Sequence, residues 1–175
     1  MPTGELVRLR AFEPSEAEAL WRWNHDAEVM RWMDDGYPDS LAQVTKRMSE
    51  WKANSYEKVV LAVETLADAQ LIGVVVLRDV QPETGHAELD IYIGEKDHWG
   101  SGYATDAMRT ACRFGFEKMR LHRITLWVVA DNVAARRVYE KAGFVEEGRQ
   151  RESFRRDGRW HDMVMMGLLE GELRG

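Results

Sequence analysis

The sequence contains only one cysteine, Cys112, among its 175 residues. A single thiol cannot form an internal disulfide or an all-cysteine zinc site. The five histidines show none of the spacings that are typical of metal-binding motifs. Long apolar runs are also missing, because a stretch such as residues 72–77 is far shorter than the roughly 20 residues of a membrane-spanning helix. These absences exclude a disulfide scaffold and argue against a metal centre and a transmembrane protein.

Residues 1–12 lack the basic and then apolar segments of a secretory signal. Acidic residues outnumber basic ones by 30 to 24, and the net charge of −6 has the wrong sign for a general nucleic-acid binder. Hydrophobic residues make up 45% and charged residues 31% of the chain, which is ordinary for a globular protein. We therefore expect a cytoplasmic protein with one domain, residues 1–175, that binds neither nucleic acid nor membranes.

The hydrophobic pattern predicts a mixed α/β domain. Helices are expected to begin near residue 13 and to cover about 27–33, 40–54, 102–119 and 132–142. Strands are expected at 5–12, 58–64, 71–80, 85–93, 124–130, 144–156 and 160–169. The last two strands are joined by Arg156-Asp157-Gly158, which is typical of a hairpin turn.

A glycine-rich turn follows a predicted strand and opens a predicted helix, with the sequence Trp99-Gly100-Ser101-Gly102-Tyr103-Ala104-Thr105. Glycines allow a tight turn with its amide N–H groups facing outward, and the start of a helix adds unpaired donors. A phosphate group can bind to such a turn. The third glycine of a dinucleotide fingerprint and the Gly-Lys-Ser/Thr of a P-loop are both missing, which argues against a nucleotide-binding α/β protein.

A second segment, residues 131–144, begins about 30 residues later. Within it, Asn132 fits a helix N-cap and Gly143 a helix C-cap, with Tyr139 between them. Together the two segments resemble the GCN5-related N-acetyltransferase (GNAT) superfamily. The Gly102-x-Ala104 part is similar to the family's pyrophosphate loop, and residues 132–144 are similar to its Asn-x-x-Ala…Tyr…Gly-Phe helix. The ending, residues 157–166, resembles the branch of ribosomal-protein-alanine and spermidine N-acetyltransferases.

This resemblance implies an α/β (α+β) GNAT fold, in which helices flank a twisted, mixed and mostly antiparallel sheet of about seven strands. It also implies that acetyl-CoA binds as the co-substrate in the splayed centre of the sheet; with no metal-binding spacing among the histidines, no metal is expected. The implied reaction is direct transfer of the acetyl group to a primary amine in a ternary complex. Many family members have Arg or Gln in place of Trp99, whose side chain cannot contact a phosphate but whose backbone N–H could.

The resemblance also assigns roles to individual residues. Tyr139 matches the tyrosine that stabilises or protonates the leaving thiolate, and a backbone N–H near Tyr92 or Ile93 would stabilise the carbonyl oxygen. The pair Arg136-Arg137 could reach the phosphates of CoA, although arginines on a helix surface usually reach only solvent. Asn132 could hold the pantetheine amide or the acceptor. The implied cofactor-binding residues are Ile91, Tyr92, Ile93, Trp99, Gly100, Ser101, Gly102, Tyr103, Ala104, Thr105, Asn132, Arg137 and Tyr139.

The general base is predicted among the polar residues of the strand at 85–93. An amine with a pKa near about 10 is mostly protonated at neutral pH and must lose a proton before it attacks a thioester. Glu88 and Asp90 lie on the polar face of this strand, opposite Ala87 and Leu89, and either carboxylate could accept the proton directly or through water. We prefer Glu88, because family members often have Glu at the matching place. The alternatives are Asp90, a water chain, or a pair of carboxylates that merely face solvent.

The acceptor is not identified by the sequence. A protein N-terminus, a polyamine, an aminoglycoside and an amino acid are all compatible with it. Trp21, Trp32, Glu88 and Asn132 are the predicted acceptor-binding residues. Residues 13–39 carry a net charge of −6 and residues 136–159 of +3, which fits either ordinary solvated surface or rims for a cationic acceptor and a phosphorylated cofactor. A homodimer is expected from the habit of the family.

Two other hypotheses compete with direct transfer. Cys112 suggests a covalent acetyl-cysteine route, but no histidine is near it in sequence, and its apolar helical neighbours favour a buried structural thiol. A catalytically silent acyl-CoA sensor or interaction module would need the glycine-rich turn alone. The presence of Tyr139 and of strand carboxylates favours an enzyme.

Overall fold

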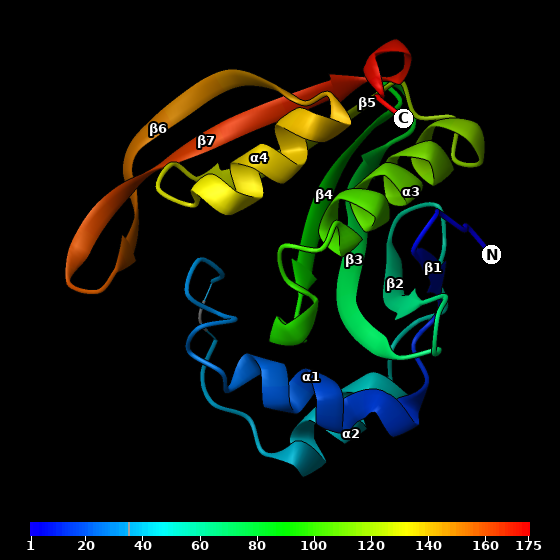
Figure 1. Ribbon diagram of the computed structural model, residues 1–175, viewed down its shortest axis with the longest axis vertical. Coiled ribbons are helices and arrows are strands. Elements are labelled where there is room, and N and C mark those ends of the chain that lie inside the picture. Colours follow the sequence, from blue (N-terminus) through cyan, green and yellow to red (C-terminus); the bar gives the residue numbers. More distant parts are fainter. Residues whose placement is uncertain (35) are drawn as a thin grey trace.

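The computed structural model describes residues 1–34 and 36–175 and contains a seven-stranded sheet flanked by helices (Figure 1). The strands are β1 (Val7–Arg10), β2 (Val59–Thr65), β3 (Leu71–Gln81), β4 (His86–Ile93), β5 (Arg123–Val129), β6 (Val145–Arg156) and β7 (Arg159–Leu169). The α-helices are α1 (Ala17–Asn24), α2 (Leu41–Ser49), α3 (Tyr103–Glu117) and α4 (Val133–Ala142), and short 3₁₀ turns lie at Pro14–Glu16, Lys96–His98 and Glu170–Glu172. Within the described residues, no helix is long and apolar enough to span a membrane.

The sheet is mixed, with strand order β1-β2-β3-β4-β5-β7-β6. All neighbouring strands are antiparallel except β4 and β5, which pair in parallel through only three residues of each strand. The last of these pairs joins Glu88 to Thr125, and both strands then continue without pairing to each other. The predicted GNAT-type sheet is therefore confirmed, and its centre is splayed between β4 and β5.

The two faces of the sheet are covered by different helices, because successive strand residues point to opposite sides. Val75 and Leu77 of β3 belong to a core shared with α3 and α4. Val74 and Val76 of the same strand pack in a second cluster with α1 and α2. Figure 1 shows the same division, with α1 and α2 below the sheet and α3 beside its other face. The splay between β4 and β5 thus opens between two packed layers.

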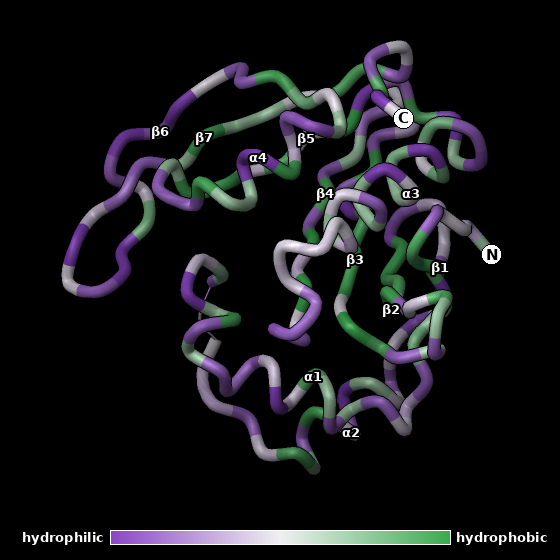
Figure 2. The backbone as a smooth tube through the Cα atoms, viewed as in Figure 1, coloured by the Kyte–Doolittle hydropathy of each residue, from purple (hydrophilic) through white to green (hydrophobic). Residues whose placement is uncertain are grey.

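The β6–β7 hairpin reaches outward from this body beside α4 (Figure 1). Its turn residues, Asp157 and Gly158, both have positive φ angles, of 53° and 72°, as expected for a two-residue hairpin turn. Figure 2 shows that the outer part of this hairpin is mostly hydrophilic. The hairpin therefore forms a polar arm next to the splayed centre.

Two of the predicted helices differ from the structure. Residues 27–33 form turns rather than a helix, although the Met30 N–H donates one helix-like bond to Asp26 C=O. The helix predicted at 40–54 begins as expected, with Ser40 in a reciprocal capping box with Gln43, but it ends at Ser49. The buried residues of this helix are Val44 and Met48, and residues 50–54 are all exposed, so the last predicted turn has no core to pack against.

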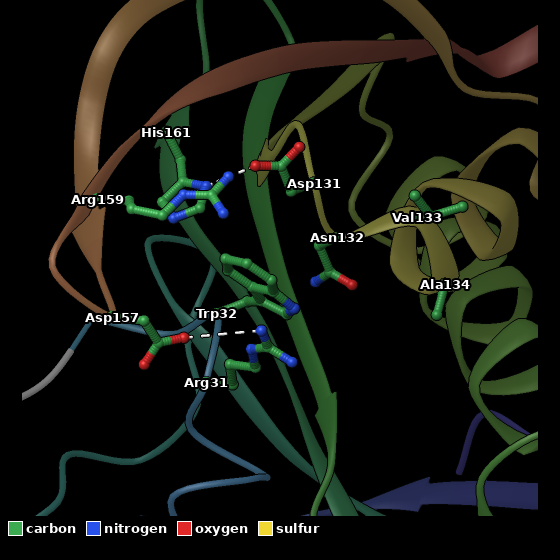
Figure 3. A pocket seen from close by; sticks show the side chains of 9 residues that line it. All are labelled: Arg31, Trp32, Asp131, Asn132, Val133, Ala134, Asp157, Arg159 and His161. Atoms are coloured by element: carbon green, nitrogen blue, oxygen red, sulfur yellow. Dashed lines mark hydrogen bonds and ion pairs between the residues drawn. The ribbon is translucent and has the colours of Figure 1, made fainter.

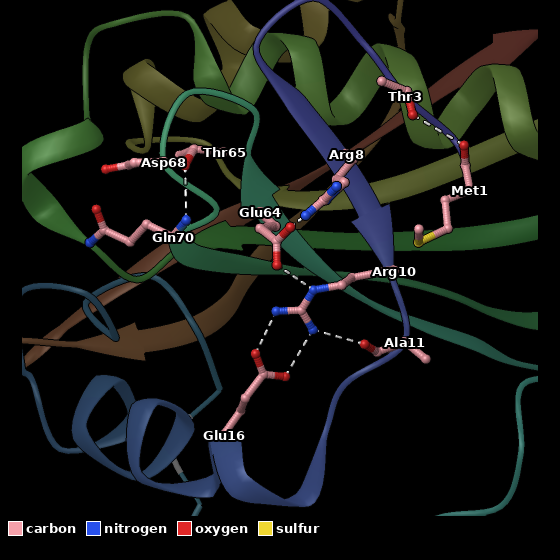
Figure 4. Close-up of polar contacts among 10 residues, drawn as sticks. All are labelled: Met1, Thr3, Arg8, Arg10, Ala11, Glu16, Glu64, Thr65, Asp68 and Gln70. Atoms are coloured by element: carbon pink, nitrogen blue, oxygen red, sulfur yellow. Dashed lines mark hydrogen bonds and ion pairs between the residues drawn. The ribbon is translucent and has the colours of Figure 1, made fainter.

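A buried carboxylate ties the N-terminal strand to the sheet (Figure 4). Glu64 on β2 is 5% exposed and forms ion pairs with Arg8 and Arg10 of β1. Arg10 Nε lies 2.5 Å from Glu64, and Arg10 Nη2 lies 2.5 Å from Glu16 at the start of the first helical segment. Burial acts to raise the pKa of Glu64, but the hydrogen bonds from Arg10 and Arg8 outweigh it and the pKa is lowered.

We predict that Glu64→Gln lowers the free energy of unfolding at pH 7 by about 2 kcal/mol, less than for a fully buried pair because both arginines are partly exposed. A lowered folded-state pKa stabilises the protein above the ordinary value of 4.5, and this contribution is lost as the pH falls through the folded value. Urea unfolding at several pH values should show the variant and the natural protein converging in acid. Glu57→Gln, at an exposed position, serves as the control, and a difference that persists in acid would contradict this account.

Candidate active site

The open edge of β4 faces the splay. The N–H of Gly94, just after β4, donates to Ile72 C=O of β3. Successive residues of a strand direct their backbone N–H and C=O groups to opposite sides, so every second residue of β4 directs them away from β3. Ile91 and Ile93 therefore direct their N–H and C=O groups toward the side from which β5 has diverged. An indole N–H, that of Trp99, donates to Ile93 C=O at 2.8 Å. This edge can pair with an extended amide-containing ligand such as pantetheine.

Tyr92 lies differently from its two neighbours. The alternation directs its backbone toward β3, and its ring packs edge-on against Trp23 of α1 at 6.1 Å between centroids. Burial raises the pKa of its phenol. Of the two backbone donors predicted for the carbonyl oxygen, the geometry therefore favours Ile93 over Tyr92.

The glycine-rich turn leads into α3 in a conformation that suits an anion. Gly100 and Gly102 have φ angles of 71° and 87°, in the left-handed region that favours glycine. Gly102 is the N-cap of α3, and no side chain caps this helix end. The first amides of the helix, those of Tyr103, Ala104 and Thr105, have no acceptor within the helix and can bind a phosphate.

Trp99 differs from its prediction. Its backbone N–H, expected to be available for a phosphate, donates to Lys96 C=O at 3.0 Å. Its indole reaches Ile93, so this side chain connects the turn to the open edge of β4. Ser101 is exposed, and its hydroxyl lies 3.5 Å from Trp99 C=O. The phosphate-binding donors are therefore expected after Trp99 rather than at it.

Tyr139 lies on α4 and is 8% exposed. Its ring packs against Phe144 at 6.1 Å between centroids, and its hydroxyl makes no hydrogen bond to any residue in 1–34 or 36–175. Burial, and secondarily the negative charge of Asp90, raise its pKa. The phenol is therefore protonated at neutral pH and is free to donate a hydrogen bond.

The two strand carboxylates share one guanidinium. Arg78, opposite Glu88 on the neighbouring strand β3, places Nη2 2.6 Å from Glu88 Oε1 and Nε 2.6 Å from Asp90 Oδ2. Arg78 Nη2 also lies 3.5 Å from Asp90 Oδ1, and Nη1 pairs with Asp79. Both oxygens of Asp90 are thus engaged, whereas Glu88 keeps one oxygen for a proton or a water. Sequence analysis missed Arg78, because the register of the β3–β4 pair shifts between Gln81 and Arg78 and the pairing at the turn does not place Arg78 opposite Glu88.

Cys112 is fully buried on α3, and burial raises the pKa of its thiol. Its Sγ lies 3.8 Å from the sulfur of Met108. A buried, protonated thiol is a poor nucleophile, which disfavours an acetyl-cysteine route.

The arginine pair on α4 also divides into two roles. Arg136 Nη2 lies 3.2 Å from Glu146 and Nη1 lies 3.4 Å from Ala130 C=O, so this side chain stabilises the local structure. Arg137 is exposed and makes no hydrogen bond or ion pair with the part of the chain that the structure describes. Arg137 is therefore the member of the pair that is available to a phosphate.

A pocket of about 460 Å³ lies between the hairpin, the start of α4 and the segment around Trp32 (Figure 3). We call it the hairpin pocket, and its lining residues are Arg31, Trp32, Asp131, Asn132, Val133, Ala134, Asp157, Arg159 and His161. Two predicted acceptor-binding residues, Trp32 and Asn132, are brought together there. Asn132 also caps α4 by accepting the Ala135 N–H at 3.2 Å. Trp21 does not line this pocket, and its indole N–H donates to Asp39 C=O.

Sequence analysis also missed a histidine–carboxylate pair in this pocket. His161 is 7% exposed, and its Nδ1 lies 2.5 Å from Asp131 Oδ2. Its ring packs edge-on against Trp32 at 5.2 Å, and Nε2 lies 3.3 Å from Arg156 C=O. The partners come from distant parts of the chain, so no local pattern could have identified them.

The acidic segment 13–39 is largely neutralised by neighbouring cations. Seven of its eight acidic residues lie within the described chain, and Asp35 lies outside it. Four of the seven form ion pairs, namely Glu16 with Arg10, Asp26 and Glu28 with Lys96, and Asp39 with Arg47. The net charge of the segment therefore overstates its attraction for a cation. No group of three or more potential metal ligands is present among residues 1–34 and 36–175.

Comparison with known proteins agrees with this geometry. The acetyltransferase (GNAT) domain model matches residues 7–145. The spermidine N(1)-acetyltransferase of Vibrio cholerae is 29% identical over 95% of this chain and 94% of its own, and the putative ribosomal N-acetyltransferase YdaF of Bacillus subtilis is 27% identical over 98% and 95%. A crystal structure of spermidine N-acetyltransferase from Vibrio cholerae in complex with CoA and spermine has a TM-score of 0.85 at 28% identity, covering 95% of this chain and 96% of the other.

Proposed function

The chain belongs to the GNAT acetyltransferase family, and from this membership we propose that it transfers an acetyl group from acetyl-CoA to the primary amine of a small acceptor. The observation that carries the proposal is the combination of three features around one splay. These are the unpaired edge of β4, the uncapped start of α3 and the free hydroxyl of Tyr139. The named relatives that act on spermidine support an amine as the acceptor.

The residues present fit CoA. The backbone of Ile91 would pair with the amides of the pantetheine arm, and the N–H of Ile93 would remain for the thioester carbonyl. The first amides of α3, after Gly102, would bind the pyrophosphate, and Arg137 would contact a phosphate. When bound, acetyl-CoA supplies an activated acetyl thioester.

Side chains and backbone groups of the protein would accept the proton of the acceptor and donate hydrogen bonds during the reaction. Glu88, through its free oxygen, accepts a proton from the acceptor ammonium, and the neutral amine attacks the carbonyl carbon of the thioester. The backbone N–H of Ile93 stabilises the negative charge that develops on the carbonyl oxygen. Tyr139 donates a hydrogen bond to the departing sulfur, and the second proton that the attacking nitrogen loses neutralises the thiolate, so that CoA leaves as the thiol. Because the amine attacks directly, both substrates are bound together and positioning contributes much of the rate.

We predict that Glu88→Gln lowers kcat/KM by about 10²-fold near neutral pH, with the loss shrinking as the pH approaches the amine pKa of about 10. Above that pKa the amine is already deprotonated, and no base is needed. Asp90→Asn should have a smaller effect, because Arg78 holds both oxygens of Asp90. Rate profiles from about pH 6 to about pH 10 make the comparison.

The control for these profiles is Glu83→Gln, at an exposed position in the β3–β4 turn. A pH-dependent loss in Asp90→Asn alone would assign the base to Asp90. If neither variant loses more than about threefold, the proton leaves through water and positioning supplies the catalysis.

The proposal as a whole is tested by measuring release of free CoA from acetyl-CoA with a panel of amines. The panel contains spermidine, an aminoglycoside, free amino acids and short peptides. Amine-dependent release is the expected result. Tight binding of acetyl-CoA without release with any amine would favour a silent acyl-CoA sensor instead.

A further inference from the structure

The carboxylates of the hairpin pocket are already engaged by positive or hydrogen-bonding groups. Asp131 lies 2.5 Å from His161, and Asp157 lies 3.6 Å from Arg31 (Figure 3). The Arg31 guanidinium also lies over the ring of Trp32, 4.9 Å from its centroid. A cationic ligand entering this pocket would therefore have to displace an existing partner before it could form an ion pair.

Arg159 is a charged residue of the pocket whose side chain has no partner among the described residues. Its guanidinium makes no hydrogen bond or ion pair within residues 1–34 and 36–175, and its side chain lines the pocket beside His161. A planar guanidinium with free donors matches a carboxylate in charge and in geometry. The pocket is thus complementary to an anionic group.

One wall of the pocket lies at a defined distance from Tyr139. Asn132, in the pocket wall, is the N-cap of α4 and precedes Tyr139 by seven residues, which is close to two full turns. The two residues therefore share one side of the helix and lie about 10 Å apart along its axis. Three extended peptide residues span about the same length.

We propose that the acceptor is a peptide-like primary amine whose carboxylate lies about three residues from the amine and binds to Arg159 in the hairpin pocket. This inference rests on the proposed acetyl transfer. The amine would lie at Tyr139 and Glu88, while the Trp32 ring covers the chain between the two ends. A polyamine of the same length would place an ammonium beside Arg159, where like charges repel.

The test compares acceptors that differ only in the anionic group. Trialanine and trialanine amide have the same amine and the same length, and spermidine is the cationic alternative. A longer peptide amide with Asp at position three, against its Asn counterpart, tests whether the carboxylate can come from a protein N-terminus instead of a free peptide. Release of CoA gives kcat/KM for each acceptor.

Trialanine is expected to exceed its amide by about 10- to 100-fold in kcat/KM, the effect of one charge-assisted hydrogen bond. Arg159→Gln should remove this preference by lowering kcat/KM with trialanine far more than with trialanine amide. Arg159→Lys keeps the charge and should restore part of the preference. Arg113→Gln, which removes an exposed arginine from α3, is the matched control.

Equal use of trialanine and its amide, a preference for spermidine, or equal loss with both peptides in Arg159→Gln would each overturn the inference. The proposed acetyl transfer would survive any of these results, because an amine would still be acetylated. Absence of CoA release with every acceptor would instead overturn both proposals.

Discussion

Replacing Tyr139 by Phe is expected to lower kcat by about 10²–10⁴-fold while the affinity for acetyl-CoA changes little. Phenylalanine fills the same buried space against Phe144 and removes only the hydroxyl. That hydroxyl would stabilise the leaving sulfur in the transition state and not in the bound ground state, so the loss should fall on kcat. Steady-state kinetics together with calorimetric titration of acetyl-CoA separate the two quantities.

The pH profile provides a second check on Tyr139. Because burial and the charge of Asp90 raise its pKa, the phenol should remain a proton donor through neutral and moderately alkaline pH. Tyr56→Phe, at an exposed position, is the matched control. Unchanged kcat in Tyr139→Phe, or a loss of acetyl-CoA affinity of the same size as the loss of kcat, would contradict the assigned role.

Replacing Gly102 by Val is expected to weaken acetyl-CoA binding by about 100-fold or more, because a β-branched residue strongly disfavours the φ of 87° found there. An added Cβ would meet only Leu6, at 3.5 Å, so strain in the turn and obstruction of the phosphate, rather than a clash in the core, should cause the loss. The first amides of α3 would then no longer converge on one phosphate.

Gly148→Val is the control for this substitution. Gly148 lies on β6 without a positive φ, and an added Cβ there would meet nothing within 4 Å. Calorimetry should show acetyl-CoA affinity unchanged in this variant. If Gly102→Val also bound acetyl-CoA with the affinity of the unsubstituted protein, the turn would be excluded as the pyrophosphate site.

The parts of the structure that the sequence predicted well are those with local signals. Strand alternation around Glu88, the helix cap at Asn132 and the left-handed stop at Gly143 all depend on neighbouring residues, and all lie where the pattern placed them. The glycine-rich turn is similarly local, and its positive φ angles at Gly100 and Gly102 agree with the tight turn that was predicted.

The features that the sequence did not reveal depend on contacts between distant segments. Arg78 holds both strand carboxylates from the neighbouring strand, and His161 meets Asp131 across 30 positions of sequence. Residues 27–33 form turns instead of the predicted helix, and the end of this segment contacts the hairpin, where Arg156 donates to Met33 C=O at 2.8 Å. The structure on the acceptor side therefore depends more on contacts between distant segments than the structure of the cofactor-binding turn does.

The most direct test of acetyl transfer follows the acetyl group itself. Acetyl-CoA with an isotopically labelled acetyl group is incubated with the protein and trialanine, and both the peptide and the protein are examined by mass spectrometry. The account predicts labelled acetyl on the amine of the peptide, free CoA in equal amount, and no label on Cys112 or elsewhere on the protein at any time. Label that accumulates on the protein before it reaches the peptide, or acetyl-CoA that stays intact with every amine, would contradict it.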